Sequence, residues 1–404
     1  MRILVVSQYF WPENFRINDL ASELVGRGHE VTVLTGLPNY PNGQIFKEYV
    51  ADSEKFSNYK GVQVVRVPLL PRGNGAFRLL LNYLSFLISS CVLGPWKLRG
   101  RFDVVLTYQL SPVTVGLPGA LLAWLKNVPM VMWVLDLWPD TLKAIGVIKS
   151  PRLLAYIEKF VGFIYRRCDL IWVQSRSFIP KIQSLTGPSI PVVYLPSWAE
   201  DLFGLEARTP AQEVPAKDGA FNIMFAGNIG EAQDFECILS AATLLKEHSN
   251  IRWLIVGDGR MSSWVKAEIQ RRGLESCVLM LGRHSVERMP EFFLHADAML
   301  LTLADREIFS MTIPGKLQSY LAAGKPVIAA LNGEGADVIR AANAGLTCMA
   351  GNAVGLAEIV RKMSELPASE RLVMGKNGLE FSKREFDRRM VLDIAEKYLS
   401  RLIE

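Results

Sequence analysis

Residues 311–330 read MTIPGKLQSYLAAGKPVIAA, and this stretch is the most informative for the fold. It predicts a loop, a helix of about ten residues, a stop at a glycine and a buried strand. Proline is tolerated at the helix start because the first helical N–H groups have no intrahelical acceptor, and Gly315 lets another molecule approach the backbone. Lys316 opposes the helix macrodipole unless an anion lies between its ammonium group and the free amides. The stretch therefore predicts a phosphate site, with a solvated lysine on an ordinary helix as the alternative.

Outward from this stretch, short apolar strands alternate with amphipathic helices along the whole chain, which is typical of doubly wound α/β domains. The expected strands are residues 3–6, 31–34, 104–107, 130–135, 170–174 and 192–194, and then 222–226, 251–256, 278–281 and 298–303. A segment rich in proline, alanine and charge separates the two series near residue 200. With 404 residues, two domains are expected: 1–199 and 200–382, with a ligand cleft between them.

Residues 383–404 form a third expected segment, an amphipathic helix from about residue 387 to 402. Its apolar side must pack on another part of the protein, and it consists of Met390, Val391, Ile394, Tyr398 and Leu402.

The composition excludes several classes of protein. Half of the residues are hydrophobic and 21% are charged, so the chain is globular. The net charge of +5 is mild and no long basic run occurs, which argues against nucleic-acid binding but leaves a basic surface facing anionic lipid possible. Five cysteines without a CxxC pair indicate free thiols in a reducing compartment. Only four apolar residues follow Arg2 before Ser7, too few for a signal peptide, so a cytoplasmic protein is expected.

One apolar segment, residues 79–96, is long enough to raise the question of a membrane. It reads LLLNYLSFLISSCVLGPW and is flanked by Arg78 and Lys97. A spanning helix needs about 20 predominantly apolar residues, and Asn82 and Pro95 are among the residues that interrupt this one. A buried core helix is the favoured interpretation, ahead of a helix partly in the membrane interface and of a true span.

Glycine-containing loops follow three strands of the second domain and should meet at one sheet edge, where open α/β sheets bind ligands. The first loop places GNIG at residues 227–230, before a helix, and the second reads VGDGR at 256–260. The GxxG spacing differs from GxGxxG, which argues against a dinucleotide oxidoreductase, and a plain turn is an equally good explanation of it. The candidate phosphate contacts in these loops are Gly227, Asn228, Gly230, Gln233 and Arg283.

In the first domain, two loops after strands combine aromatic, carboxylate and amide side chains, which suit sugar faces and hydroxyls. The first loop offers Trp11, Glu13, Asn14 and Arg16 as acceptor contacts, and the turn-rich loop 36–44 is a candidate mobile lip. The second loop, LDLWPD, contains Asp136, either an acid or base or an ordinary helix cap. No DxD, HExxH, GxSxG or GxxxxGK[ST] motif occurs, so metallohydrolase, serine hydrolase and P-loop functions are not indicated, and neither a metal nor a cofactor is expected.

Taken together, these residues resemble the retaining glycosyltransferases of family 4 over nearly the whole chain. The resemblance is carried by ELVGRGHEVTVLTG, YLPSWAEDLF, IMFAGNIGEAQDFE, LIVGDGR, LGRHS and PGKLQSYLAAGKPVIAA. It is strongest to the bacterial branch assigned to N-acetyl-L-fucosamine transfer in O-antigen and capsule synthesis. The resemblance implies the GT-B fold, with two Rossmann-like domains. It also implies a nucleotide-sugar donor on the second domain, an acceptor on the first, and a last helix that returns to the first domain.

The chain departs from the family pattern at several positions. Met311 and Ser319 stand where two signature glutamates are usual, and Leu135 replaces a histidine before Asp136. Asn228 and Gln233 replace an arginine and a lysine. Lys316 and the helix amides would therefore carry more of the diphosphate charge, together with Arg16. The donor contacts implied by the resemblance are Thr312, Ile313, Pro314, Gly315, Lys316, Gln318 as a substitute ribose contact, and Ser319.

The sequence thus predicts a metal-independent glycosyltransferase with Lys316 and Asp136 as its catalytic residues. The expected donor is a UDP-sugar, with an N-acetylated deoxyhexosamine as the sugar. The expected acceptor is a polyprenyl-diphosphate-linked saccharide of O-antigen or capsule, reached by peripheral contact with the inner face of the cytoplasmic membrane. A degenerate, non-catalytic partner subunit and a nucleotide-sugar epimerase are the alternatives. An integral transporter is excluded because the sequence has only one marginal apolar segment.

Overall fold

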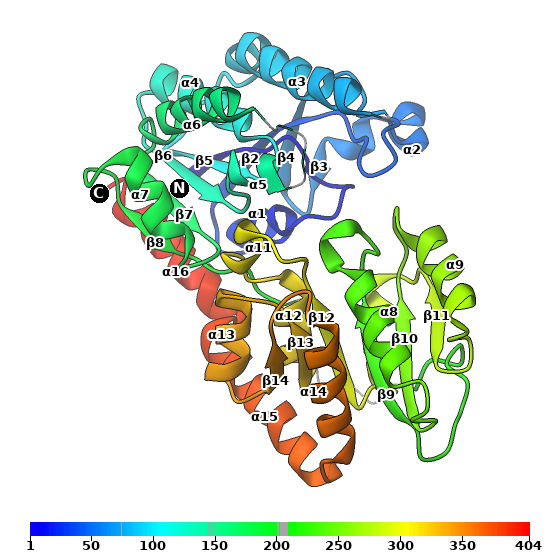
Figure 1. Cartoon of the computed structure of the whole chain (residues 1–404). Helices are drawn as coiled ribbons and strands as arrows, with labels where there is room; N and C mark the ends of the chain where they lie inside the picture. Colours follow the sequence, from blue (N-terminus) through cyan, green and yellow to red (C-terminus); the bar gives the residue numbers. More distant parts are fainter. Residues whose placement is uncertain (74, 145, 147, 149, 200–201, 203–208) are drawn as a thin grey trace. The chain divides into compact units, whose positions relative to one another are not determined.

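The computed structural model describes residues 1–73, 75–144, 146, 148, 150–199, 202 and 209–404. The chain divides into two compact units, Met1–Leu195 with Arg389–Glu404, and Pro196–Arg388. The expected boundary at residue 199, and part of the YLPSWAEDLF motif, adjoin or fall on residues outside the described ones. Each unit is a doubly wound α/β layer structure (Figure 1).

Among its described residues, the first unit has an eight-stranded sheet in the order β3-β4-β2-β1-β5-β6-β7-β8. The strands are parallel except for β3, which pairs antiparallel with β4. Central strands such as β1 are almost wholly buried, as expected for parallel strands covered on both faces. The bounds are β1 (Arg2–Val6), β2 (Glu30–Gly36), β3 (Asn58–Tyr59), β4 (Val62–Val67), β5 (Val104–Gln109), β6 (Met130–Val134), β7 (Leu170–Val173) and β8 (Val192–Tyr194).

Helices cover both faces of this sheet. Their bounds are α1 (Arg16–Gly26), α2 (Lys47–Ala51), α3 (Ala76–Lys97), α4 (Gly116–Lys126), α5 (Asp140–Ala144), α6 (Pro151–Tyr165), α7 (Phe178–Thr186) and α16 (Arg388–Arg401), with 3₁₀ turns η1 (Glu54–Phe56) and η2 (Val113–Val115). The chain first builds the sheet outward from β1 through β2 to β4 and then in the opposite direction from β5 to β8. Because crossovers between parallel strands are right-handed, α1 lies on one face and α3, α4 and α6 on the other.

The last helix, α16, packs beside α1. Arg27 at the end of α1 forms ion pairs with Asp393 and Glu396, each at 2.7 Å, and Glu396 also lies 2.8 Å from His29. The buried side of α16 agrees with the expected one only at Val391, since its other members are Leu392, Ala395 and Leu399. A small residue, Ala395, occupies the centre of the contact and permits close packing, which leaves Ile394 and Tyr398 half-buried at its edges.

Helix α3 also differs from the favoured expectation of a buried core helix. Its segment Phe77–Lys97 is long and apolar enough to cross a membrane, yet only 22% of its apolar window is buried inside the protein. The polar residues that interrupt the apolar run face inward. Asn82 is buried and bonds to Gln8 at 2.7 Å and to the Leu70 carbonyl at 2.7 Å. One apolar side of the helix faces outward, while Phe86 is buried with Asn82.

The described part of the second unit has a six-stranded parallel sheet in the order β11-β10-β9-β12-β13-β14. The strands are β9 (Phe221–Ala226), β10 (Ile251–Val256), β11 (Val278–Gly282), β12 (Ala298–Thr302), β13 (Val327–Ala330) and β14 (Gly345–Cys348). The helices are α8 (Phe235–Leu244), α9 (Ser262–Arg272), α10 (Met289–Phe293), α11 (Glu307–Ser310), α12 (Gly315–Ala322), α13 (Glu334–Ala341), α14 (Ala353–Glu365) and α15 (Ala368–Glu385), with 3₁₀ turns η3 (Glu231–Gln233) and η4 (Val286–Arg288).

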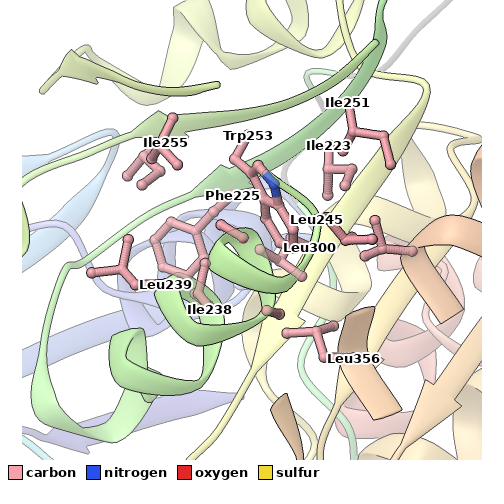
Figure 2. Close-up of a cluster of buried hydrophobic side chains, with 14 of the residues drawn as sticks. Ile223, Phe225, Ile238, Leu239, Leu245, Ile251, Trp253, Ile255, Leu300 and Leu356 are labelled. Atoms are coloured by element: carbon pink, nitrogen blue, oxygen red, sulfur yellow. The ribbon is translucent and has the colours of Figure 1, made fainter. Parts of the chain in front are cut away.

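The hydrophobic core of this unit packs its helices against its sheet. Figure 2 shows Phe225, Trp253 and Leu300 from three strands, packed with Ile238 of α8 and Leu356 of α14. Truncating a buried aromatic such as Trp253 to alanine typically costs about 3–5 kcal/mol. The loops at the carboxyl edge of the sheet are therefore carried by a rigid platform.

Candidate active site

The candidate site lies where the second sheet reverses its strand order. Strands β9 and β12 are neighbours, but the chain leaves β9 towards β10 and reaches β12 only after β11. Ligands of open α/β sheets bind at such a switch point, outside the carboxyl ends of the strands. Here the loop after β9 begins at Gly227, and the chain after β12 leads through α11 to Lys316 on α12.

The loops after β9 and β10 are locked together by close backbone contacts. Gly227 and Gly257 have φ angles of 138° and 144°, which favour glycine. A Cβ atom on Gly257 would lie only 1.9 Å from the Gly227 carbonyl oxygen. The amide of Ile229 also donates to the Asp258 carbonyl at 2.9 Å. Glycine at 257 is thus required by the packing of one loop on the other, and glycine at 227 by its φ angle and by the nearby Lys316 side chain.

Lys316 extends from the first turn of α12 beneath this pair of loops. Its Nζ lies 3.8 Å from the centroid of the Phe225 ring, and its Cε lies 2.6 Å from the point that a Cβ atom on Gly227 would occupy. The ammonium nitrogen is buried and has no hydrogen-bond partner among the described residues. Burial lowers the pKa of Lys316 to about 7. The site therefore holds a buried amine that is only partly protonated at neutral pH and has no hydrogen-bond partner among the described residues.

The start of α12 supplies amide donors beside this lysine. Pro314 precedes the helix and provides no side-chain cap, and the space that a side chain on Gly315 would enter is open. The amide of Leu317 donates to the Pro314 carbonyl at 2.8 Å. The amides of Gly315 and Lys316 have no acceptor within the helix, so they favour an anion at this end.

Of the donor contacts expected at residues 312–315, Thr312 and Pro314 offer no free backbone amide. The Thr312 amide donates to the Phe309 carbonyl at 3.3 Å and its hydroxyl to the Ile308 carbonyl at 2.8 Å. Pro314 has no N–H to offer, and the Ile313 side chain is buried. The helix also begins at Gly315, because the backbone at Pro314 is extended.

The other predicted donor contacts differ in how far they are exposed and in what holds them. Asn228 and Arg283 are exposed on the loops after β9 and β11. Gln233 is held in the turn, where its Oε1 accepts from the Gly230 amide at 3.1 Å. Gln318 is buried and donates to the Ser197 carbonyl at 2.7 Å, while its Oε1 has no partner among the described residues. Ser319 is half-buried on α12.

Two residues important to this geometry were missed by sequence analysis. Phe225 provides the ring against which the ammonium group of Lys316 lies. Tyr320, four residues after Lys316, places its hydroxyl 3.0 Å from the amide and 3.1 Å from the carbonyl of Ala226. Only their positions could have identified them in the sequence. Phe225 is the residue before the last of β9, and Tyr320 follows Lys316 by one helical turn. Together they fix α12 against β9.

In the first unit, Asp136 is held by hydrogen bonds. Its Oδ1 accepts from the Thr141 hydroxyl at 2.5 Å, and its Oδ2 accepts from the Ser111 hydroxyl at 2.5 Å and from the Trp138 indole N–H at 3.3 Å. Burial raises the pKa of Asp136, against the lowering effect of these bonds. The carboxylate is thus fixed in place by the loops after β5 and β6.

The predicted acceptor residues have different surroundings. Glu13 is turned inward, and its carboxylate accepts from the amides of Asn39 at 2.8 Å, Tyr40 at 2.7 Å and Phe10 at 3.3 Å. Burial raises the pKa of Glu13 to about 7. Trp11 stacks on Tyr59 at a centroid distance of 5.1 Å. Asn14 is exposed and Arg16 half-exposed at the start of α1. Glu13 therefore shapes the loops, while Asn14 and Arg16 face the accessible side.

A hollow of about 530 Å³ adjoins these loops. Its lining includes Pro12 from the loop after β1, Gln44 from the predicted mobile lip, and Lys47 and Phe56 from the following turns. In the same unit, the Arg72 guanidinium lies 5.4 Å from the centroid of the Tyr40 ring, and sequence analysis did not identify this pair. Across the described residues of both units, no group of three or more His, Cys, Asp or Glu side chains is placed to hold a metal ion.

Comparison with known families assigns both units to one class of enzyme. Residues 14–198 match the model described as "Glycosyl transferase 4-like domain", and residues 208–381 match "Glycosyl transferases group 1". The chain is therefore a glycosyltransferase with the GT-B fold, and the predicted fold class is confirmed.

Three known proteins show what the chain is similar to. WcaI of Escherichia coli K12, assigned by name to colanic acid biosynthesis, is 26% identical over 339 residues, which cover 80% of this chain and 82% of WcaI. Sucrose-phosphate synthase from Thermosynechococcus elongatus shares the fold with a TM-score of 0.76, at 14% identity, over 100% and 99% of the two chains. Anabaena HepE, solved in complex with UDP and glucose, has a TM-score of 0.69, at 15% identity, over 99% of both chains.

Proposed function

We propose that this glycosyltransferase moves a sugar, an N-acetylated deoxyhexosamine, from a UDP-sugar to a lipid-linked oligosaccharide in the synthesis of a surface polysaccharide. The reaction proceeds with retention and without a metal, at the inner face of the cytoplasmic membrane. The observation that carries the proposal is the buried ammonium group of Lys316, which has no partner among the described residues and lies beside the amides of Gly315 and Lys316.

A diphosphate fits this arrangement because it supplies the missing negative charge. With a pKa of about 7, Lys316 is only partly protonated at neutral pH in the free protein. A phosphate next to the ammonium group favours the charged form and raises its pKa, so nucleotide binding is coupled to proton uptake. During transfer the leaving UDP gains negative charge, which the protonated lysine and the helix amides stabilise.

The comparisons support the choice of donor and pathway. HepE was solved with UDP and glucose, and WcaI is assigned by name to colanic acid biosynthesis. On the first unit, Asp136 orients the acceptor or the sugar. Three hydrogen bonds hold its carboxylate, so a role in positioning is favoured over proton transfer.

The direct test is UDP binding by Lys316→Met, measured by isothermal titration calorimetry. Methionine keeps the length and the contact with the Phe225 ring but has no charge. We expect at least a tenfold loss of affinity, equivalent to about 1.4 kcal/mol. Lys266→Met is the matched control, because Lys266 is exposed on α9 of the same unit. Unchanged UDP affinity in Lys316→Met would remove the basis of the proposal.

A second variant tests the position of the ribose. If Ser319 stands where the family has its second glutamate, Ser319→Glu should retain or increase affinity for UDP. A large loss of affinity in a folded variant would show that the ribose does not lie beside this turn of α12.

A non-catalytic nucleotide-binding subunit is the second candidate, favoured by one observation. Met311 and Ser319 stand at the positions of the expected glutamates, so the ribose and sugar contacts are fewer. Release of UDP from a panel of UDP-sugars, in the presence of a lipid-linked acceptor, separates the two functions. A protein that binds UDP but releases none from any donor would be the non-catalytic subunit.

A further inference from the structure

We propose that α3, α4 and α6 of the first unit form a membrane-binding surface that lies in the headgroup region of an anionic lipid leaflet. The inference deepens the proposed function, on which it rests for the lipid-linked acceptor, by naming the surface and the lipid charge. Its geometric basis is an exposed apolar face with basic residues around it.

The first part of this face is a stripe along the full length of α3. Its members recur every three or four residues, so they lie on one side of the helix. They are Phe77, Leu80, Leu84, Ile88, Val92 and Trp96. Phe77 and Trp96 are each 72% exposed and Ile88 is 61% exposed, so this side of the helix contacts no other part of the described protein to any large extent. A helix of 22 residues extends about 33 Å, which is much longer than the isolated apolar spots of ordinary surfaces.

The second part comes from the two helices that follow on the same face of the sheet. Helix α4 contacts both α3 and α6, so the three helices lie side by side (Figure 1). On α4, Trp124 is 76% exposed, and on α6 a second stripe is formed by Leu153, Tyr156, Phe160 and Phe163. Trp and Tyr side chains are suited to the interface because their rings combine an apolar body with a polar group.

The charge around this face is complementary to anionic lipid. Residues 72–167, which contain all three helices, include twelve Lys and Arg but only four Asp and Glu, a net charge of +8. Because the whole chain has a net charge of +5, the remainder is net negative. The exposed basic residues next to the stripes include Arg78, Lys97, Arg99, Arg101, Arg152 and Lys159.

The four carboxylates of this segment do not oppose the binding of anionic lipid. Asp103 pairs with Arg2 at 2.8 Å, and Glu158 and Asp140 lie 3.3 and 3.6 Å from Lys181. Asp136 is held by its three hydrogen bonds inside the unit. The charge that the face presents to a leaflet is therefore positive, and anionic headgroups are attracted to it.

The inward side of α3 argues for a helix that lies in the interface and does not span the bilayer. Asn82, Phe86 and Ser90 are buried against the rest of the unit, and Asn82 bonds to Gln8 and to the Leu70 carbonyl. Crossing the bilayer would remove α3 from these contacts and transfer its buried polar groups to hydrocarbon, which is costly. Lying in the interface retains the contacts and covers only the exposed stripe.

Co-sedimentation of the full chain with vesicles tests the surface. We expect the protein to sediment with vesicles of phosphatidylcholine mixed with phosphatidylglycerol, and less with phosphatidylcholine alone. In Ile88→Glu/Val92→Glu, partitioning into the mixed vesicles should fall by at least about tenfold, because two exposed aliphatic side chains leave the lipid contact. Arg99→Gln/Arg101→Gln should lose about fivefold per charge on the mixed vesicles.

The matched control is Leu372→Glu/Val373→Glu on α15 of the second unit, whose side chains are exposed to a similar extent. It should bind vesicles like the wild type. The surface is refuted if the wild type does not sediment with the mixed vesicles, or if the α3 variant sediments as well as the wild type. It is also refuted if light scattering without lipid shows a dimer that the α3 variant dissociates, because the occupant is then a second copy of this chain. UDP affinity should be unchanged in the α3 variant, so a failure of this surface and a failure at Lys316 are distinguishable.

Discussion

The unpaired ammonium group of Lys316 should destabilise the free second unit, and Lys316→Met should remove this penalty. The folded-state pKa of about 7 lies below the ordinary value of 10.5, so folding disfavours the protonated form. The penalty is therefore complete below pH 7, decreases as the pH rises, and is absent above pH 10.5. Methionine does not ionise and keeps an unbranched apolar chain against the Phe225 ring.

The size of the effect follows from the pKa difference. At about 1.4 kcal/mol per pKa unit, the penalty is about 5 kcal/mol at pH 6 and about 2 kcal/mol at pH 9. For a unit of this size, 1 kcal/mol changes the melting temperature by about 2–4 °C. Lys316→Met should thus raise the melting temperature of the second unit by roughly 10–20 °C at pH 6 and by roughly 4–8 °C at pH 9.

Differential scanning calorimetry at the two pH values, with and without UDP, measures these changes. UDP should raise the melting temperature of the wild type and have little effect on the variant. An equal rise at pH 6 and pH 9 would mean that the variant gains from packing and not from the loss of charge. No rise at pH 6 would mean that the ammonium group is paired or hydrated in solution, which would refute the reasoning.

Three further outcomes are expected. In Gly227→Ala, the new Cβ would lie 2.6 Å from Lys316 Cε at a φ of 138°, so the affinity for UDP measured by calorimetry should fall more than about tenfold. The control is Gly100→Ala, where a Cβ atom meets nothing within 4 Å, and it should leave the affinity unchanged. The first unit should lose stability as the pH rises from about 4.5 to about 7, since burial raises the pKa of Glu13, and a melting-temperature series should show a flatter slope for Glu13→Gln. Arg27→Ala removes the ion pairs with Asp393 and Glu396, so amide exchange in α16 should increase by about tenfold by mass spectrometry, with no change in α15.

The alternation of strands and helices was predictable because parallel strands buried on both faces are continuous apolar runs. Strand β10, for example, has the predicted bounds Ile251–Val256. Strand β4 was missed, because it lies near the sheet edge and its pattern VQVVRV mixes buried and exposed positions. Which side of α3 faces the protein could not be predicted either. The sequence shows that α3 is long and mostly apolar. Which side of the helix faces the protein depends on the hydrogen bonds of Asn82 to Gln8 and to the Leu70 carbonyl, which only the structure shows.

In the candidate site too, the sequence identified single residues but not how they are packed. Lys316 was identified from its place at a helix start, yet its burial depends on Phe225 and Gly227, which precede it by about ninety residues in the chain. Glu13 and Asp136 were expected to face a ligand because both lie in polar loops after strands. Each accepts three hydrogen bonds from the protein, which turn Glu13 inward and fix the orientation of the Asp136 carboxylate, and no local pattern in the sequence predicts these bonds.

The two hydrogen bonds between the Tyr320 hydroxyl and Ala226 have a consequence for substrate selectivity. They fix the first turns of α12 during folding, so a phosphate group would enter a preorganised site and little binding energy would be spent on ordering it. Met311 precedes these turns in a loop, and Ser319 lies on the half-buried side of the helix. In the proposed function, Lys316 and the free amides at the start of α12 hold the diphosphate, while Ser319, one turn further along, lies beside the ribose. If the proposed function is right, we expect a substitution at position 319 to change selectivity for the nucleotide more than it weakens the anchor for the diphosphate.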